Sequence, residues 1–363
     1  MYNRKKNFRN ISRYTEIEEK AISKNYKKED LVCIPEMNVE LIKEVYKEDN
    51  INIFAFDASF IKKSGKKTEE LGKFWDGKNS RSEKGLEISL LALVDTVYNT
   101  AYAISCLQTD SKLEDGETRM GFYLKHLDKS KKYFPEIKHI AVDGFHSKKG
   151  FVDGVSNMGK YVICKLRSDA NLIYIYQGEQ TGKKGANKKY DGKVNLSNHK
   201  FNYVMTLPKG EKLFTDIVYS PSLKRTIKIV FLLTKESKHH IFYSTDLKLS
   251  PLDIFDFYSS RFQIEFLFKD SKGSTGLEDC QSTNKKILNT HFNMSFFVLN
   301  ATKIQERITK GETKSTFSIL NYQKTAANTQ MLNLFIHKFE IDMSSKKMVD
   351  AYQDMLTIGL IAC

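Results

Sequence analysis

The sequence predicts a mixed α/β fold, in which a central mixed sheet of β-β-β-α-β-α order is interrupted by a β-rich segment and flanked by helical ends. The first observation is a series of apolar runs rich in β-forming residues between positions 51 and 107. The second is a helix-favouring stretch at 117–134, followed by another apolar run. The third is a succession of alternating strands from about 160 to 245.

The first apolar run, residues 51–57, predicts a strand that ends in Asp57. A Gly- and Lys-rich turn region to about residue 85 follows it. Residues 86–95 and 101–107 are similar runs separated by a polar turn, so we expect neighbouring antiparallel strands. After the helix at 117–134, residues 139–143 form a strand that again closes with an aspartate, Asp143, before a glycine turn.

The segment 161–245 alternates in the manner of an all-β insertion. It contains a basic loop at 182–190 that lacks the spacing of a phosphate-binding P-loop and has no helix behind it. We interpret this loop as able to contact backbone phosphates, although a solvated surface loop is an equal alternative. The lysines concerned are Lys183, Lys184, Lys188 and Lys189.

A long helix should begin at Ser250, which is an N-cap followed by a first-turn proline, and end at Gly273. Residues 284–310 predict a second helix, and the remainder predicts helices with loops. The chain thus divides into a basic helical part at 1–50, a core at 51–160 and 246–310, the β-rich insertion at 161–245, and a helical part at 311–363.

Composition restricts the class of partner. The formal net charge of +14 predicts attraction to a polyanion, with nucleic acid as the leading candidate. Forty per cent apolar residues indicate a folded chain, and no run approaches the roughly 18 apolar residues of a membrane span. The five scattered cysteines favour reduced thiols, so we expect a cytoplasmic protein without a membrane partner.

Four reactive side chains share one face of the predicted helix at 250–272. Tyr258, Arg261, Glu265 and Lys272 fall in a stripe about 60° wide, at about 100° per residue. Apolar residues take most of the remaining circumference, so the helix should be largely buried, and a buried carboxylate is costly unless paired or bound to metal. The simpler alternative is an internal ion pair between Arg261 and Glu265, which are four residues apart.

The two strand-end aspartates favour a catalytic interpretation of Glu265. A hard divalent cation such as Mg²⁺ takes carboxylate oxygens and keeps waters for substrate phosphates. Asp57, Asp143 and Glu265 together would suffice for two ions, one activating the attacking oxygen and the other stabilising the leaving oxygen of a phosphodiester. Arg261 and Lys272 would hold phosphates nearby.

The spacing of Tyr258, Arg261, Glu265 and Lys272 resembles the Tyr-(2)-Arg-(3)-Glu-(6)-Lys signature of the insertion-sequence-4 family, a branch of the DDE transposases. The resemblance covers about residues 51–300 and implies a ribonuclease-H-like core with a β-rich insertion before the last catalytic helix. It also implies that Asp57, Asp143 and Glu265 bind Mg²⁺ or Mn²⁺, and that the other three signature residues contact DNA phosphates.

The same resemblance implies cleavage and strand transfer on double-stranded DNA, both at the terminal inverted repeats of an element and at its target, by a homodimer. Two features depart from the family pattern. Only about 50 residues precede Asp57, so end recognition should be reduced or the copy incomplete. The single tryptophan, Trp75, lies outside the insertion, so base stacking there would need a residue such as Tyr174, Tyr176 or Tyr190.

Other residues and functions remain open at this stage. Asp76, Glu87, Asp95 and Asp153 are alternative carboxylates, but none both closes an apolar strand and fits the spacing. His146 could assist a metal, although a core or surface histidine is the commoner case. The alternative functions are a degenerate or repurposed DNA-binding protein, and a ribonuclease-H-like nuclease without strand transfer.

Overall fold

A computed structural model describes residues 5–28, 33–113, 115–180, 186–311 and 317–361. The chain begins with three short helices, α1 (Phe8–Tyr14), α2 (Glu19–Asn25) and α3 (Ile34–Lys43). This agrees with the helical N-terminal part predicted from the sequence. Val39 and Ile42 of α3 pack into the main core, so this helix is part of the folded body.

The first half of the chain builds a mixed sheet. Strand β1 pairs antiparallel with β3 and parallel with β5, and β5 pairs parallel with β6. Both β2 and β4 pair with β3, at opposite ends of that long strand. The strands are β1 (Asn52–Lys62), β2 (Gly72–Asp76), β3 (Arg81–Asp95), β4 (Thr100–Gln108), β5 (His139–Val142) and β6 (Tyr161–Leu166).

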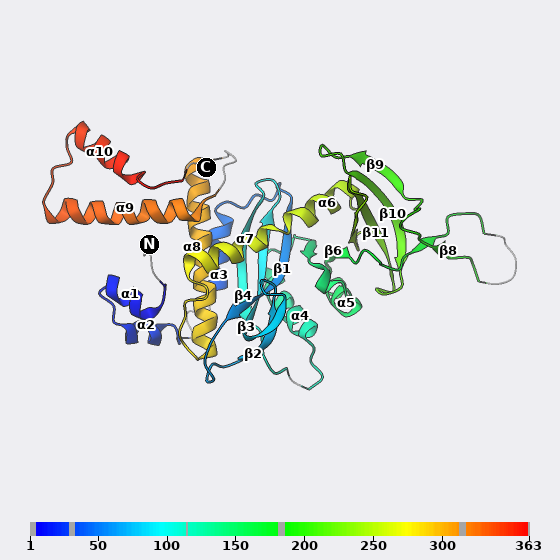
Figure 1. The fold of residues 1–363 in the computed structure, drawn as a ribbon, viewed down its shortest axis with the longest axis horizontal. Helices are drawn as coiled ribbons and strands as arrows, with labels where there is room; N and C mark the ends of the chain where they lie inside the picture. The colour runs from blue at the N-terminus through cyan, green and yellow to red at the C-terminus, as the bar shows by residue number, and fades with distance from the viewer. Residues whose placement is uncertain (1–4, 29–32, 114, 181–185, 312–316, 362–363) are drawn as a thin grey trace.

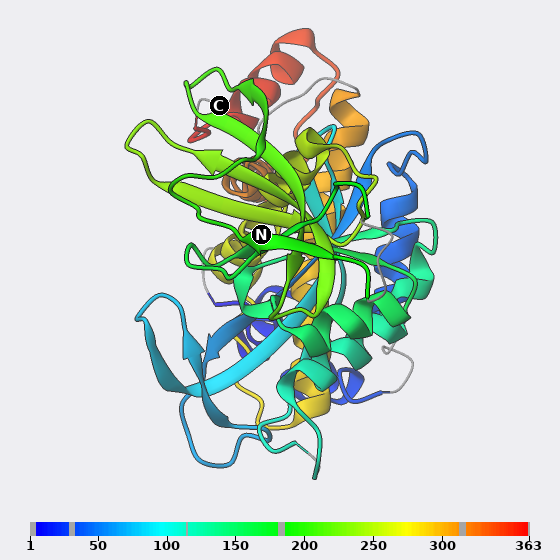
Figure 2. The ribbon, with the colours of Figure 1, turned by 90° about the vertical axis from the view of Figure 1, so that its right-hand side faces the viewer.

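The β-rich segment was correctly predicted as strands, and it continues the same sheet. Its last strand, β12, pairs antiparallel with β6, so within the described chain one twelve-stranded sheet runs from β2 to β8. Figure 2 views this segment from its own end, with its green strands in front of the rest. The further strands are β7 (Ile173–Ile175), β8 (Tyr190–Lys193), β9 (Asn202–Thr206), β10 (Lys212–Ser220), β11 (Arg225–Leu233) and β12 (His239–Ser244).

Helices cover both faces of the sheet (Figure 1). One face packs with α4 (Arg119–Ser130) and α5 (Lys149–Asn157) through apolar side chains such as Phe122 and Phe151. The other packs with α6 (Pro251–Ser260), α7 (Gln263–Asp270) and α8 (Lys285–Lys310). We call this second side the α6/α7 face. The arrangement is a mixed α/β fold compatible with a ribonuclease-H-like core.

Two predictions about strands are wrong. The first strand does not end at Asp57 but runs on to Lys62, because Ala58–Ile61 continue the pairing with β3. The region to residue 85 is not only turn, since it contains β2 and the start of β3. The alternation of apolar and polar side chains in this region is too short to predict a strand, because glycines and lysines surround it.

The predicted long helix is also different from the structure. Its N-terminus is as expected, with the Ser250 hydroxyl accepting from the Asp253 amide. It is broken between α6 and α7, and it ends in a π-helix, η4 (Ser271–Thr275), capped by left-handed Gly276 rather than by Gly273. The helix is only partly buried, because Phe262 and Phe266 are 49% and 38% exposed.

The C-terminal part is helical, as predicted. Helices α9 (Ile319–Lys338) and α10 (Lys346–Leu356) extend away from the sheet beyond the end of α8 (Figure 1). We call these two helices the C-terminal arm. Among the described residues, a search for helices with the length and apolarity of a membrane span finds none.

Candidate active site

Asp57 and Asp143 lie side by side on adjacent parallel strands. The last paired residues of β1 and β5 are Phe56 and Val142, and each aspartate is the next residue of its strand or loop. Ala55 and Ala141 point to the α6/α7 face, so by the two-residue alternation of a strand both carboxylates point there too. Their side chains are 21% and 39% exposed, so the pair can be reached from solvent. We call these two residues the aspartate pair.

The two carboxylates have opposite pKa shifts. Burial and the negative charge of Asp143 raise the pKa of Asp57 to about 6. Burial also favours the neutral form of Asp143, but the hydrogen bond and charge of His146, together with Arg261, outweigh it and lower the pKa of Asp143. The site therefore concentrates negative charge that its own cations only partly offset.

Arg261 links the aspartate pair to Glu265. It ends α6 at the break before α7, and its side chain is only 9% exposed. Its Nη2 donates to Glu265 Oε1 at 2.7 Å, and its Nη1 lies 3.7 Å from Asp57 Oδ2. Arg261 Nε and Nη1 are buried without a hydrogen-bond partner within the described residues. One guanidinium therefore supplies counter-charge to carboxylates from β1 and α7.

Tyr258 lies on the same side as Arg261, one turn earlier in α6. Its ring is 5.6 Å from the Arg261 guanidinium carbon and 4.6 Å from the Phe242 ring of β12. Burial raises the pKa of Tyr258 to about 12, so the hydroxyl is neutral and can donate a hydrogen bond at neutral pH. Tyr258, Arg261 and Glu265 are thus brought together as the sequence spacing predicts.

The Lys272 side chain does not join the cluster of Tyr258, Arg261 and Glu265. Its Nζ donates to the carbonyl of Phe60 at 2.6 Å and lies 3.5 Å from Glu278 Oε1. The π-helix in which it sits changes the angular spacing on which the predicted four-residue stripe depended. Lys272 therefore contacts β1 beyond Asp57, and its side chain is 30% exposed there.

The sequence pattern of a known family matches residues 5–310 of the chain, which is most of its length. The family is a DDE transposase family described as "Archaeal putative transposase ISC1217". The chain belongs to this family. The match begins at residue 5, so the helices before β1 lie within the family pattern. No curated protein matches the chain with comparable significance.

His146 is a site residue of this transposase whose role the sequence did not predict. It lies in the 3-10 turn η3 (Gly144–His146) directly after Asp143, and its Nδ1 is 2.6 Å from Asp143 Oδ1. Its side chain is 1% exposed and packs against the rings of Phe56 and Phe151. The sequence signal for this orienting contact is the position of His146, three residues after the predicted strand-end Asp143.

The alternative carboxylates have partners of their own elsewhere in the transposase. Asp95 pairs with Arg307 at 3.0 Å, and Glu87 pairs with Arg119 at 2.8 Å. Asp153 pairs with Arg225, and Asp76 accepts from the Lys78 and Asn79 nitrogens of its own turn. These contacts give each of the four carboxylates a structural role.

The described part of the basic loop, residues 186–189, leads into β8, which is the last strand of the sheet and is separated from β5 by five other strands. Lys183 and Lys184 fall outside the described residues. Lys188 pairs with Asp191 at 2.7 Å and lies 4.3 Å from the Tyr176 ring centre. Lys189 is exposed. If Lys188 and Lys189 contact phosphates as predicted, those phosphates would belong to DNA away from the aspartate pair.

The donor set suits a hard divalent cation at the aspartate pair. DDE transposases generally use divalent metal ions. In the described chain, no three His, Cys, Asp or Glu side chains are gathered as a ready metal cluster, because Arg261 stands between Asp57 and Glu265. The two aspartates fit such an ion, since burial and the charge of Asp143 raise the pKa of Asp57, and a cation would offset both effects. Glu265 is bonded to Arg261 instead.

Proposed function

We propose that this transposase cuts DNA at the ends of an insertion-sequence element and joins those ends to a target, with Asp57, Asp143 and Glu265 as the catalytic carboxylates. The observation that carries this proposal is the aspartate pair on adjacent strand positions, joined through Arg261 to Glu265 across the same face. Mg²⁺ or Mn²⁺, as two ions, would be held by these three side chains.

The bound ions would supply activation of the attacking oxygen and charge stabilisation of the leaving oxygen. The chain's own residues would do the rest. His146 would hold the Asp143 carboxylate in one orientation through the 2.6 Å contact. Arg261, when it releases Glu265, would have buried donors free for a backbone phosphate, and Tyr258 would donate a hydrogen bond beside it.

Within the DDE transposases, we propose that the chain works as the insertion-sequence-4 branch does. This is supported by the contacts among three of the signature residues. Arg261 contacts both Tyr258 and Glu265, so the three lie in one local cluster. Lys272, with its Nζ on the Phe60 carbonyl, would have to leave that contact to reach a phosphate. Its role is the part of the signature with least support from the geometry.

The experiment is a cleavage assay with the full chain, Mg²⁺ and duplex DNA carrying the sequences that flank its own gene. The wild type should nick or cut at the element ends, and Glu265→Gln should reduce cleavage at least 100-fold, on the order of one lost metal ligand, while DNA binding persists. Glu40→Gln is the matched control, because Glu40 is exposed on α3, where it pairs with Lys43. Equal cleavage by wild type and Glu265→Gln contradicts the assignment.

The same assay separates the other functions. DNA binding with no metal-dependent cleavage on any end sequence would indicate a DNA-binding protein. Cleavage without joined products, in an assay that supplies a target duplex, would indicate a nuclease. The transposase proposal requires both cleaved ends and joined products.

We also propose that the DNA complex contains two copies of the chain, because an element has two ends to be cut and joined. Exposed apolar side chains on the C-terminal arm support a contact between copies. Met331, Leu334, Phe335 and Phe339 are 51–67% exposed along the last turns of α9 and just beyond it. A large exposed apolar surface is typical of a protein interface.

A further inference from the structure

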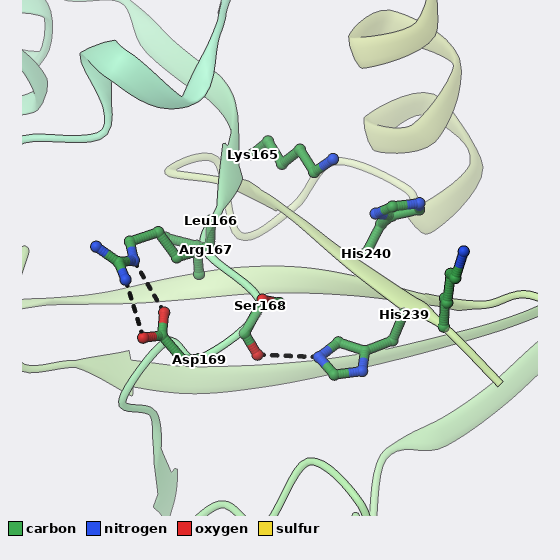
Figure 3. A pocket seen from close by; sticks show the side chains of 8 residues that line it. Lys165, Leu166, Arg167, Ser168, Asp169, His239 and His240 are labelled. Atoms are coloured by element: carbon green, nitrogen blue, oxygen red, sulfur yellow. Dashed lines mark hydrogen bonds and ion pairs between the residues drawn. The ribbon is translucent and has the colours of Figure 1, made fainter.

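A basic cavity of about 710 Å³ opens where β6 ends and β12 begins. It is lined by the end of β6, the loop after it and the start of β12. Lys165 and Arg167 come from the first segment, and Lys238, His239 and His240 come from the second. Figure 3 shows these side chains around the hollow.

The strand register places Lys165 in the same row as the aspartate pair. Strand β5 pairs parallel with β6 at a constant offset, with Ala141 opposite Ile163. The same offset brings Asp143 level with Lys165, just as Asp57 is level with Asp143 across β1 and β5. Ile163 packs on the α6/α7 face, so Lys165, two residues later, points to that face as well.

His240 lies on the next strand, two residues beyond this row. In β12, Phe242 is opposite Lys165 and packs on the α6/α7 face, where its ring contacts Tyr258 at 4.6 Å. His240 is two residues before Phe242 and therefore points to the same side. Neighbouring strands lie about 4.8 Å apart, so β12 is about 10 Å from β5. That span is the axial length of about three nucleotides of one DNA strand.

The basic side chains of this cavity differ in their contacts (Figure 3). Arg167 is held by two hydrogen bonds to Asp169, at 2.9 and 3.0 Å, and His239 contacts the Ser168 carbonyl at 2.9 Å. Lys165 Nζ and the His240 ring have no hydrogen bond or ion pair to any residue that the structure describes. In Figure 3 both are directed toward the same side, where a helix passes.

We propose that Lys165 and His240 bind backbone phosphates of the DNA strand that passes through the active site, one to three nucleotides from the cleaved bond. The proposal rests on the proposed function, because it extends the path of the DNA from the aspartate pair across β6 and β12. The ammonium group supplies a full charge, and the imidazole supplies a hydrogen-bond donor. Glu211 is the carboxylate whose charge acts on His240, and Lys165, His239 and Lys238 oppose it.

The contributions of the two side chains can be measured separately. Burial and the charges of Lys165, His239 and Lys238 lower the pKa of His240, so at pH 8 its ring is neutral. Only Lys165 then releases a counterion when a phosphate binds. Replacing it should reduce the slope of log affinity against log salt concentration by about 0.9. Replacing His240 should weaken binding without changing that slope.

The experiment measures binding of the full chain to duplex DNA from the flanks of its gene by fluorescence anisotropy at pH 8, without metal, over a range of salt concentrations. Lys165→Gln should weaken binding about tenfold at low salt, as expected for one charged hydrogen bond, and reduce the slope. Lys165→Arg should restore the slope, and His240→Gln should weaken binding alone. Lys129→Gln is the matched control, because Lys129 is exposed on α4, which packs on the opposite face.

The outcomes separate this subsite from the function on which it rests. If the wild type binds DNA, and Lys165→Gln has the same affinity and slope as Lys129→Gln, the subsite is wrong and the transposase proposal stands. If the wild type binds no DNA at all, the proposed function is wrong and the subsite falls with it. Thermal unfolding of each variant should match the wild type, since Lys165 and His240 make no polar contact in the described structure whose loss would destabilise it.

Discussion

Arg261 is the residue on which the charge balance of the active site depends. It is 9% exposed, bonded to Glu265 and 3.7 Å from Asp57. A buried cation between carboxylates lowers their repulsion, and its removal leaves buried charge without compensation. The same position is where a divalent ion would act on these carboxylates. On the proposed function, Arg261 would compete with metal in the free protein and would turn to a phosphate when metal and DNA are bound.

Arg261→Gln should lower the free energy of unfolding by about 3 kcal/mol without metal, because the acidic residues around it lose their counter-charge. Added Mg²⁺ should stabilise this variant more than the wild type, since Arg261 no longer opposes its binding. Urea unfolding with and without Mg²⁺ measures both effects. Arg9→Gln is the control, because Arg9 makes one exposed ion pair with Glu19. Equal responses to Mg²⁺ in Arg261→Gln and the wild type would argue against the competition.

His126 gives the protein a specific sensitivity to acid. Its two ring nitrogens contact the Ser89 and Ser105 hydroxyls at 2.8 Å in the buried face under α4. Burial, with a smaller effect of Lys129, lowers the pKa of His126 from 6.5 to about 3. Below pH 6.5 the unfolded chain takes up a proton that the folded protein does not, so stability is present above that pH and is lost as the pH falls toward 3.

His126→Gln should remove this contribution. Between pH 7.5 and pH 5 the wild type should lose about 2 kcal/mol more of its free energy of unfolding than the variant does. Other titrating groups are shared by both proteins and cancel in the comparison. Chemical denaturation at several pH values measures the difference. A parallel loss in the two proteins would show that His126 is not held neutral.

At the scale of elements, the sequence predicts strands better than their ends. Strand β5 ends at Val142, one residue before the predicted end at Asp143, because a turn begins at Gly144. Strand β1 continues past Asp57, because Phe60 and Ile61 add buried apolar positions that pair with β3. Local composition predicts where a strand can form, but the end of β1 depends on its pairing with the long strand β3. The hydrogen bond between His146 and Asp143 could not be predicted from composition either, since it depends on the conformation of the turn after β5.

The helix that carries Glu265 illustrates the same limit. Its N-cap follows from local sequence, but the break at residues 261–262 and the π-helix do not. Arg261 at this break faces the carboxylates, while the next residue, Phe262, is 49% exposed. Regular periodicity placed Lys272 with the other signature residues, whereas the π-helix turns it toward Phe60.

Two glycines test where this helical segment ends. Gly276 has φ +82°, and a Cβ there would lie 2.5 Å from Lys6 Cβ, so Gly276→Ala should destabilise the protein by about 1–3 kcal/mol. Gly273 has open space around its Cβ position and no positive φ, so Gly273→Ala should be neutral or slightly stabilising. Thermal or urea unfolding of the two variants measures this contrast. The reverse order would support a helix that ends at Gly273.

At the scale of the whole molecule, the active site and the C-terminal arm lie at different places in the fold (Figure 1). The site depends on a sheet shared by both halves of the sequence, which places Asp57 and Asp143 side by side. The arm adds apolar surface without a cover, including the contacting Phe335 and Phe339 rings at 4.6 Å. On the proposed function, we therefore expect that cutting and association can be disrupted separately.

Replacing Phe335 and Phe339 together by serine should shift the DNA complex from two copies of the chain toward one, with the fold unchanged. The reason is the loss of exposed apolar area that a second copy would bury. Light scattering of the DNA complex measures the mass. Ile17→Ser is the control, because Ile17 is 51% exposed near the N-terminus. A complex of unchanged mass would place the contact between copies elsewhere.

The most direct test of the central claim is Mn²⁺ binding by the full chain in complex with DNA, followed by electron paramagnetic resonance. The claim is that the aspartate pair, on neighbouring strands, holds divalent ions. Asp57→Asn and Asp143→Asn should each weaken Mn²⁺ binding at least tenfold, whereas Asp76→Asn, which alters only an exposed turn, should leave it unchanged. Mn²⁺ binding that is the same in all three variants and the wild type would contradict the account.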